Sequence, residues 1–142
     1  MYGTTFFQIP VVFSAYANSG KDYNENTYVK GFNGFKVNYG PKGFDLNTGV
    51  FTAPINGIYE FSFAIYHYQQ GSSRIEVEKN NVKELSFTSY AGTDDSNSDT
   101  LSATWYMKLY KNDKIQLKVL NKHFYSSSKA NAVFNGKYLR SI

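Results

Sequence analysis

Apolar and polar side chains alternate along most of this chain, and this period of two constrains the fold more than any other feature. From residue 59 to 65 every second side chain is aromatic or aliphatic, and the same alternation recurs at 75–77, 101–109 and 115–119. Such alternation is typical of strands with one buried face. No window shows the period of a helix. We therefore expect an all-β domain of eight or more short antiparallel strands, arranged as a sandwich or barrel.

Tyrosine and phenylalanine are unusually frequent, which favours the same fold. The 142 residues include 13 Tyr and 12 Phe, and aromatic residues make up 18% of the chain. Aromatic rings pack well on the pleated surface of a sheet. The length suits one domain, so we expect a single domain over residues 1–142, with the first few residues forming an arm that is either disordered or foreign to the natural sequence.

Several classes of protein are excluded by residues that the sequence lacks. Without cysteine there is neither a disulfide nor a thiolate metal site. Apolar windows fall well short of the roughly 20 residues of a membrane-spanning helix. The motifs G-x-S-x-G and H-E-x-x-H are absent, and His67 continues an apolar face as a packed histidine would, so we expect no enzyme. A net charge of +4 without a dense basic stripe favours no nucleic-acid partner.

An acidic loop at 91–100 is a candidate calcium site. It contains Asp94, Asp95 and Asp99 together with Ser and Asn. Calcium prefers hard oxygen ligands in a flexible loop, so these three aspartates are the expected ligands. An acidic loop that binds no metal is the alternative.

Lysines gather in the second half of the chain and are candidates for binding an anionic ligand. Lys114 and Lys118 alternate with inward-facing apolar residues, so both should point outward. The candidate ligand-binding residues are Lys108, Lys114, Lys118, Lys122, His123 and Tyr125. The lysines would attract anionic glycans or the phosphates of lipid A, and the two rings would stack on sugars. A solvated lysine face without a ligand remains the alternative.

Aromatic residues, asparagine and glycine also recur at a fixed spacing in the first half of the chain. The pattern is Phe32-x5-Asn38, then Phe44-x6-Phe51-x5-Gly57-x-Tyr59-x-Phe61-x-Phe63. This spacing resembles the signature of the complement C1q-type globular domain, a relative of the tumour necrosis factor (TNF) fold. The resemblance extends from Val12 to Leu139. One departure is that five residues separate Asn38 from Phe44, where the family usually has four, and we interpret this as a one-residue loop insertion.

The resemblance implies a ten-stranded antiparallel jelly-roll sandwich of the C1q/TNF type that assembles as a trimer. The aromatic residues expected in the core or at trimer contacts are Tyr59, Phe61, Phe63 and Phe134. It also implies that Asp99 corresponds to a loop aspartate that binds calcium near the trimer apex in some relatives. Asn112 stands where the family often has Gly, a replacement that a left-handed turn position tolerates.

For function, the resemblance implies an extracellular protein that binds rather than catalyses. No collagen-like Gly-x-y run is present, which is typical of stalkless invertebrate members. We expect a secreted homotrimer, with its leader outside this numbering, that acts in innate immunity as a pattern-recognition lectin for microbial or anionic glycans and lipopolysaccharide. The alternative is a trimeric secreted signalling or adhesion ligand for a protein receptor. A structural protein of a secreted matrix is a third possibility.

Overall fold

The computed structural model describes residues 11–67, 71–91, 99–121 and 124–142. In these ranges the chain forms eleven strands and no helix, which confirms the expected all-β class. The strands are β1 (Val12–Ala17), β2 (Lys21–Tyr23), β3 (Gly34–Tyr39), β4 (Phe51–Thr52), β5 (Gly57–His67), β6 (Gly71–Lys79), β7 (Val82–Ala91), β8 (Asp99–Leu109), β9 (Lys114–Asn121), β10 (Phe124–Ser126) and β11 (Ala132–Arg140).

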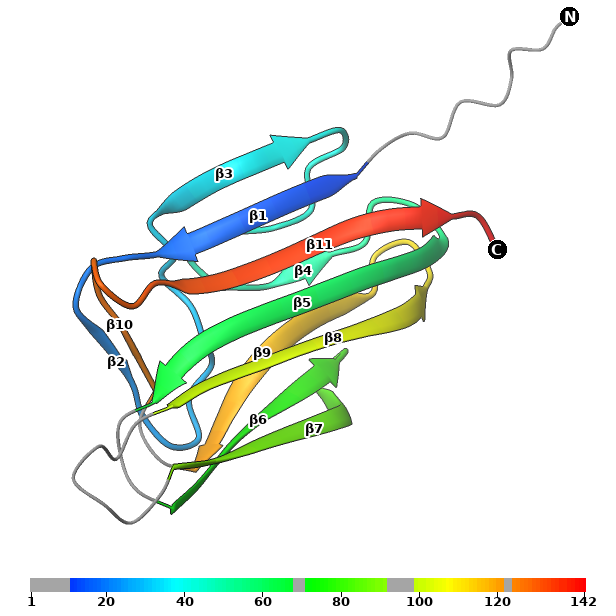
Figure 1. Ribbon diagram of the computed structural model, residues 1–142. Coiled ribbons are helices and arrows are strands. Elements are labelled where there is room, and N and C mark those ends of the chain that lie inside the picture. The colour runs from blue at the N-terminus through cyan, green and yellow to red at the C-terminus, as the bar shows by residue number, and fades with distance from the viewer. Residues whose placement is uncertain (1–10, 68–70, 92–98, 122–123) are drawn as a thin grey trace, which may run out of the picture.

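Two antiparallel sheets pack face to face as a sandwich (Figure 1). The larger sheet has seven strands in the order β2-β10-β5-β11-β1-β3, with β8 paired to β5. The smaller sheet has the order β4-β9-β6-β7. The expected jelly roll is confirmed. In the described residues it has one strand more than the ten expected. The three-residue β10 pairs with both β2 and the end of β5.

Strand β5 organises the larger sheet and one wall of the core. Its eleven side chains alternate without interruption between buried and half-buried, as the sequence pattern predicts. Strand β8 pairs with one edge of β5 over its full length, from Gly57 opposite Leu109 to His67 opposite Asp99. On the other edge β11 and then β10 take up the hydrogen bonds. One face of β5 therefore points into the sandwich and the other points out of it.

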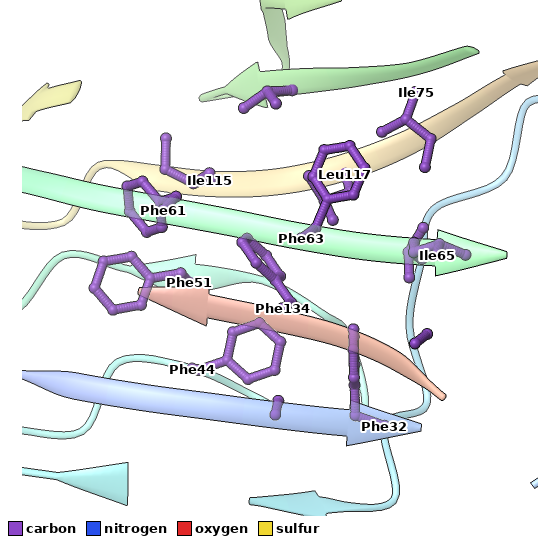
Figure 2. Close-up of a cluster of buried hydrophobic side chains, with 14 of the residues drawn as sticks. Phe32, Phe44, Phe51, Phe61, Phe63, Ile65, Ile75, Ile115, Leu117 and Phe134 are labelled. Carbon is purple, nitrogen blue, oxygen red and sulfur yellow. The ribbon is translucent and has the colours of Figure 1, made fainter. Parts of the chain in front are cut away.

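The core is a cluster of aromatic rings and aliphatic side chains to which both sheets contribute. Rings on β5 and β11 lie beside Ile115 and Leu117 of β9 (Figure 2). The four aromatic residues expected in the core or at trimer contacts, Tyr59, Phe61, Phe63 and Phe134, are at most 2% exposed in the single chain. Burying such a ring stabilises the fold by about 1.5–3 kcal/mol relative to leaving it exposed. Their burial therefore requires no second copy.

Two residues whose roles the sequence indicates shape the chain at the start of β5 and in the turn between β8 and β9. A Cβ atom at Gly57 would lie 2.1 Å from Cε1 of Tyr138, so only glycine fits there. Asn112 has φ 78°, the left-handed conformation that asparagine tolerates. Its backbone N–H donates to the carbonyl of Ala53 at 2.8 Å, and the backbone N–H of Lys111 donates to Oδ1 of Asn56 at 2.7 Å. These bonds join the turn before β5 to the turn between β8 and β9.

Candidate functional site

A chain of hydrogen bonds joins the two sheets where β5 ends and β8 begins. His67 is fully buried, and its Nδ1 lies 3.0 Å from the buried Oγ of Ser73 on β6. Its Nε2 lies 3.0 Å from Oγ of Ser89 on β7, and that hydroxyl donates to Oδ2 of Asp99 at 2.9 Å. Because Ser89 donates its proton to Asp99, it accepts from Nε2–H of His67. The packed, hydrogen-bonded histidine expected from the sequence is thus found, in contact with two serines.

Asp99 is exposed and held in an ionised form. The backbone N–H of Thr100 donates to its Oδ1 at 2.8 Å, and with Ser89 it holds the pKa of this carboxyl below the usual 3.8. Of the three predicted calcium ligands, Asp94 and Asp95 lie outside the described residues. Within the described ranges no group of three or more His, Cys, Asp or Glu could hold a metal ion. Asp99 is therefore a fixed, charged carboxylate that could supply one ligand.

The three predicted lysines that the structure describes lie on two different sheets. Lys108 stands on β8 opposite Ile58, on the outward face of the larger sheet. Lys114 and Lys118 stand on the outward face of β9, in the smaller sheet. Four residues along a strand span about 13 Å, so these two lysines can both reach one extended ligand. Lys122 lies outside the described residues.

Of the two predicted stacking rings, Tyr125 lies at the end of the larger sheet. Tyr125 on β10 is half-buried and packs edge-on against Tyr66, with the ring centroids 6.5 Å apart. It stands opposite Asp22 of β2. His123 lies outside the described residues. Tyr125 therefore belongs to the larger sheet, whereas Lys114 and Lys118 belong to the smaller one.

A hollow that the sequence did not indicate opens beside β2. Its volume is about 470 Å³, and it is lined by Lys21, Asp22, Tyr23, Asn24, Thr27, Tyr28, Lys30, Gly31 and Asn47. Segment 24–31 has no apolar alternation, so no sequence signal placed it near a site. Backbone bonds of the segment to β9 form the hollow: the N–H of Asn26 donates to the carbonyl of Val119 at 2.7 Å, and that of Val29 to Leu117 at 2.9 Å.

Tyr28 forms a fixed wall of this hollow and connects it to β9. Its hydroxyl donates to Oε1 of Glu78 at 2.9 Å, and Glu78 is only 6% exposed. Burial, together with the bond to Glu78, raises the pKa of Tyr28. Nζ of Lys118 lies 5.6 Å from the centroid of the ring, within the range of a cation–π contact. One predicted lysine thus adjoins the hollow.

The outward face of the larger sheet carries a row of polar contacts and exposed rings. Oγ of Ser14 donates to Oδ1 of Asn135 at 2.5 Å, and Nδ2 of Asn135 donates to Oγ of Ser62 at 3.0 Å. Tyr39 and Tyr106, which stand on the same face by register, are 64% and 65% exposed. Exposed tyrosines around satisfied polar groups are typical of protein interfaces.

Comparison with solved structures finds the same fold in two related groups of proteins. The globular domain of zebrafish complement 1qA has 23% identity and a TM-score of 0.74, covering 93% of this chain and 99% of that one. Eiger TNF from S. frugiperda has 10% identity and a TM-score of 0.81, covering 95% and 96%. Murine APRIL at pH 5.0 has 13% identity and a TM-score of 0.72, covering 92% and 99%. At these identities the likeness shows the fold alone.

Sequence comparison identifies the family. No curated protein sequence matches the chain, whereas the C1q domain family matches residues 12–139. Domains of this kind are typically trimeric, secreted ligands or recognition proteins that bind rather than catalyse. In the described ranges, no helix is long and apolar enough to cross a membrane. The signature spacing, the jelly roll and this match agree: the chain belongs to the C1q domain family.

Proposed function

We propose that this protein is a secreted homotrimer that recognises microbial or anionic glycans, including lipopolysaccharide, through sites repeated about a three-fold axis. The observation that carries the proposal is the separation of two surfaces on opposite sides of the sandwich. Lys114 and Lys118 lie on the outer side of the smaller sheet, and the exposed tyrosines lie on the outward face of the larger sheet. Self-association through the larger sheet would leave the lysines accessible.

The outward face of the larger sheet suits a second copy of the same chain. Tyr39 and Tyr106 offer large rings whose burial stabilises an interface. The row Ser14, Asn135 and Ser62 satisfies its own polar groups within one chain, so covering it leaves fewer unpaired donors and acceptors.

Three copies of a weak site bind a repetitive surface more tightly than one copy does. The gain comes from the high effective concentration of the second and third sites once the first has bound. Microbial surfaces display repeated anionic groups that several sites of one trimer could bind together. Exposed lysines would add attraction that weakens as salt rises, because salt screens charges separated by more than about 10 Å at 0.1 M.

The experiment has two measurements. Light scattering after size-exclusion chromatography should give three times the chain mass of 16.1 kDa. Binding to a glycan array and to immobilised lipopolysaccharide should then be measured for the wild type, for the double substitution Lys114→Gln with Lys118→Gln, and for Lys83→Gln as a control. Lys83 is an exposed lysine on β7. The double variant should bind more weakly, and the control should match the wild type.

Two results would contradict the proposal in different ways. A monomer at micromolar concentration would remove the argument from multivalency. A trimer that binds neither the array nor lipopolysaccharide would favour the signalling or adhesion ligand for a protein receptor.

A further inference from the structure

We propose that the hollow lined by β2, segment 24–31 and Asn47 binds one sugar residue that carries an anionic group, either a carboxylate, a sulfate or a phosphate. The proposal deepens the glycan-binding function above and rests on it. It assigns that function to residues that neither the sequence pattern nor the family signature indicates.

The size and rigidity of the hollow suit a small ligand. Its volume of about 470 Å³ falls in the range of roughly 300–1,000 Å³ that is common for small-molecule sites. Besides the bonds of segment 24–31 to β9, the backbone N–H of Gly31 donates to the carbonyl of Asn47 at 3.2 Å. The lining residues of this segment are therefore held in place before a ligand arrives, which reduces the entropy lost on binding.

Two ammonium groups of the lining are available to an anion. Lys21 is half-buried, and its Nζ lies 2.8 Å from the position that a Cβ atom at residue 31 would occupy. Glycine at 31 therefore leaves room for this ammonium group. Lys30 is exposed on the same lining. Across the described part of the chain, neither lysine forms an ion pair, whereas Lys137 pairs with Glu60 at 3.8 Å.

The charge of the lining favours an anion. Lys21 and Lys30 stand against one lining carboxylate, that of Asp22. Lys118 adds a third ammonium group outside the lining, 5.6 Å from the centroid of the Tyr28 ring. A half-buried ammonium group forms stronger hydrogen bonds to a charged acceptor than to a hydroxyl, so a ligand with a charged acceptor should be preferred to a neutral sugar.

The remaining lining groups suit the ring and hydroxyls of a sugar. The side chains of Asn24 and Asn47 offer amide donors and acceptors. The ring of Tyr28 offers an apolar surface whose position is fixed by its bond to Glu78. A pocket with an aromatic wall, amide groups and ammonium groups matches an acidic sugar better than an apolar ligand.

The test is a titration of the ¹⁵N-labelled full chain followed by NMR. The anionic probes are glucuronic acid, glucosamine 6-sulfate and glucose 6-phosphate, which separate the three possible anionic groups, and glucose and N-acetylglucosamine are the neutral controls. We expect at least one anionic probe to shift the amide signals of Lys30 and Gly31. Glucose should bind about tenfold more weakly, because one charge-assisted hydrogen bond contributes roughly that factor.

Matched variants assign the effect to the hollow. Lys21→Gln and Lys30→Gln should each weaken binding of the anionic probe about tenfold, while Lys83→Gln, with the same change in net charge, should bind as the wild type does. Melting temperatures of all variants should agree with the wild type, and Lys30→Gln provides the test if Lys21→Gln lowers the melting temperature.

The outcomes separate this proposal from the broader one. If lipopolysaccharide binds but substituting Lys21 and Lys30 changes nothing, the assignment of the hollow is wrong and the glycan-binding function stands. The same conclusion follows if neutral and anionic probes bind equally well. If neither the probes nor lipopolysaccharide bind the wild type, both proposals fail.

Discussion

Replacing Gly57 by alanine should destabilise the fold, because the added methyl group has no space. Its Cβ atom would lie 2.1 Å from Cε1 of Tyr138 and 2.8 Å from the backbone oxygen of Arg140. The ring of Tyr138 is half-buried and could shift. The carbonyl belongs to β11, whose Arg140 pairs with Ile58 of β5, so complete relief requires the two strands to move apart.

The expected size follows from two opposing effects. Overpacking a core position costs typically about 1–3 kcal/mol, and a contact with backbone places Gly57→Ala at the upper end. Replacing glycine also stabilises by about 0.4–1 kcal/mol, because the unfolded chain loses freedom. The net loss in the free energy of unfolding should be about 2 kcal/mol. That is a substantial part of the roughly 5–15 kcal/mol by which domains are stable.

Urea denaturation measures this loss, at one fixed protein concentration because association would change the apparent stability. Gly20→Ala is the matched control: its Cβ would meet only Oη of Tyr125, at an ordinary 3.6 Å. That variant should stay within about 0.5 kcal/mol of the wild type. Adding Tyr138→Ala should make Gly57→Ala less costly than it is alone. Equal stability of the two glycine variants, or no coupling to Tyr138, would refute the reasoning.

Three further predictions concern the loop end and the turns. Calcium at a few millimolar should raise the melting temperature by a few degrees, which is the size expected for a site of roughly millimolar affinity. Asp99→Ala should abolish this shift. An equal shift in that variant would exclude Asp99 as a ligand. Hydrogen bonds lower the pKa of both Asp99 and Asp113 below 3.8. The stability that these carboxylates contribute is therefore present above pH 3.8 and is lost as the pH falls through the lowered pKa values. Asp113→Asn should reduce this loss in acid-denaturation curves, and an unchanged slope would argue against the contribution of Asp113. His67→Phe should lower the free energy of unfolding by about 1–3 kcal/mol, because it leaves the hydroxyl of Ser73 without its partner. Adding Ser73→Ala should recover part of that loss in urea denaturation. A purely steric effect of the phenylalanine would show no recovery.

The sequence predicts the surroundings of some side chains and not those of others. Glu78 shows the limit: it lies two residues from Glu76 in an alternating strand, which predicts a solvated carboxylate. The structure instead has a register shift between Val77 and Glu78 and covers Glu78 with Tyr28. Both causes involve other parts of the chain, β7 and segment 24–31, so local alternation could not reveal them.

The candidate binding residues show the same limit. Alternation correctly places Lys114 and Lys118 on an outward face, but it does not say that Lys108 belongs to the other sheet. Lys21 and Lys30 come together with Tyr28 because segment 24–31 pairs with β9, some 90 positions along the chain. Which strands become neighbours is decided by packing of the whole domain.

The sequence by itself determined the fold class, the inward face of each long strand, the glycine at 57 and the left-handed asparagine at 112. These follow from local rules, because side chains alternate along any strand and backbone conformation limits which residues fit a turn. Only the tertiary structure decided which side chains from distant segments meet: His67 with Ser73 and Ser89, and Lys118 with the ring of Tyr28. Contacts between distant segments depend on strand order and register, which alternation alone leaves open.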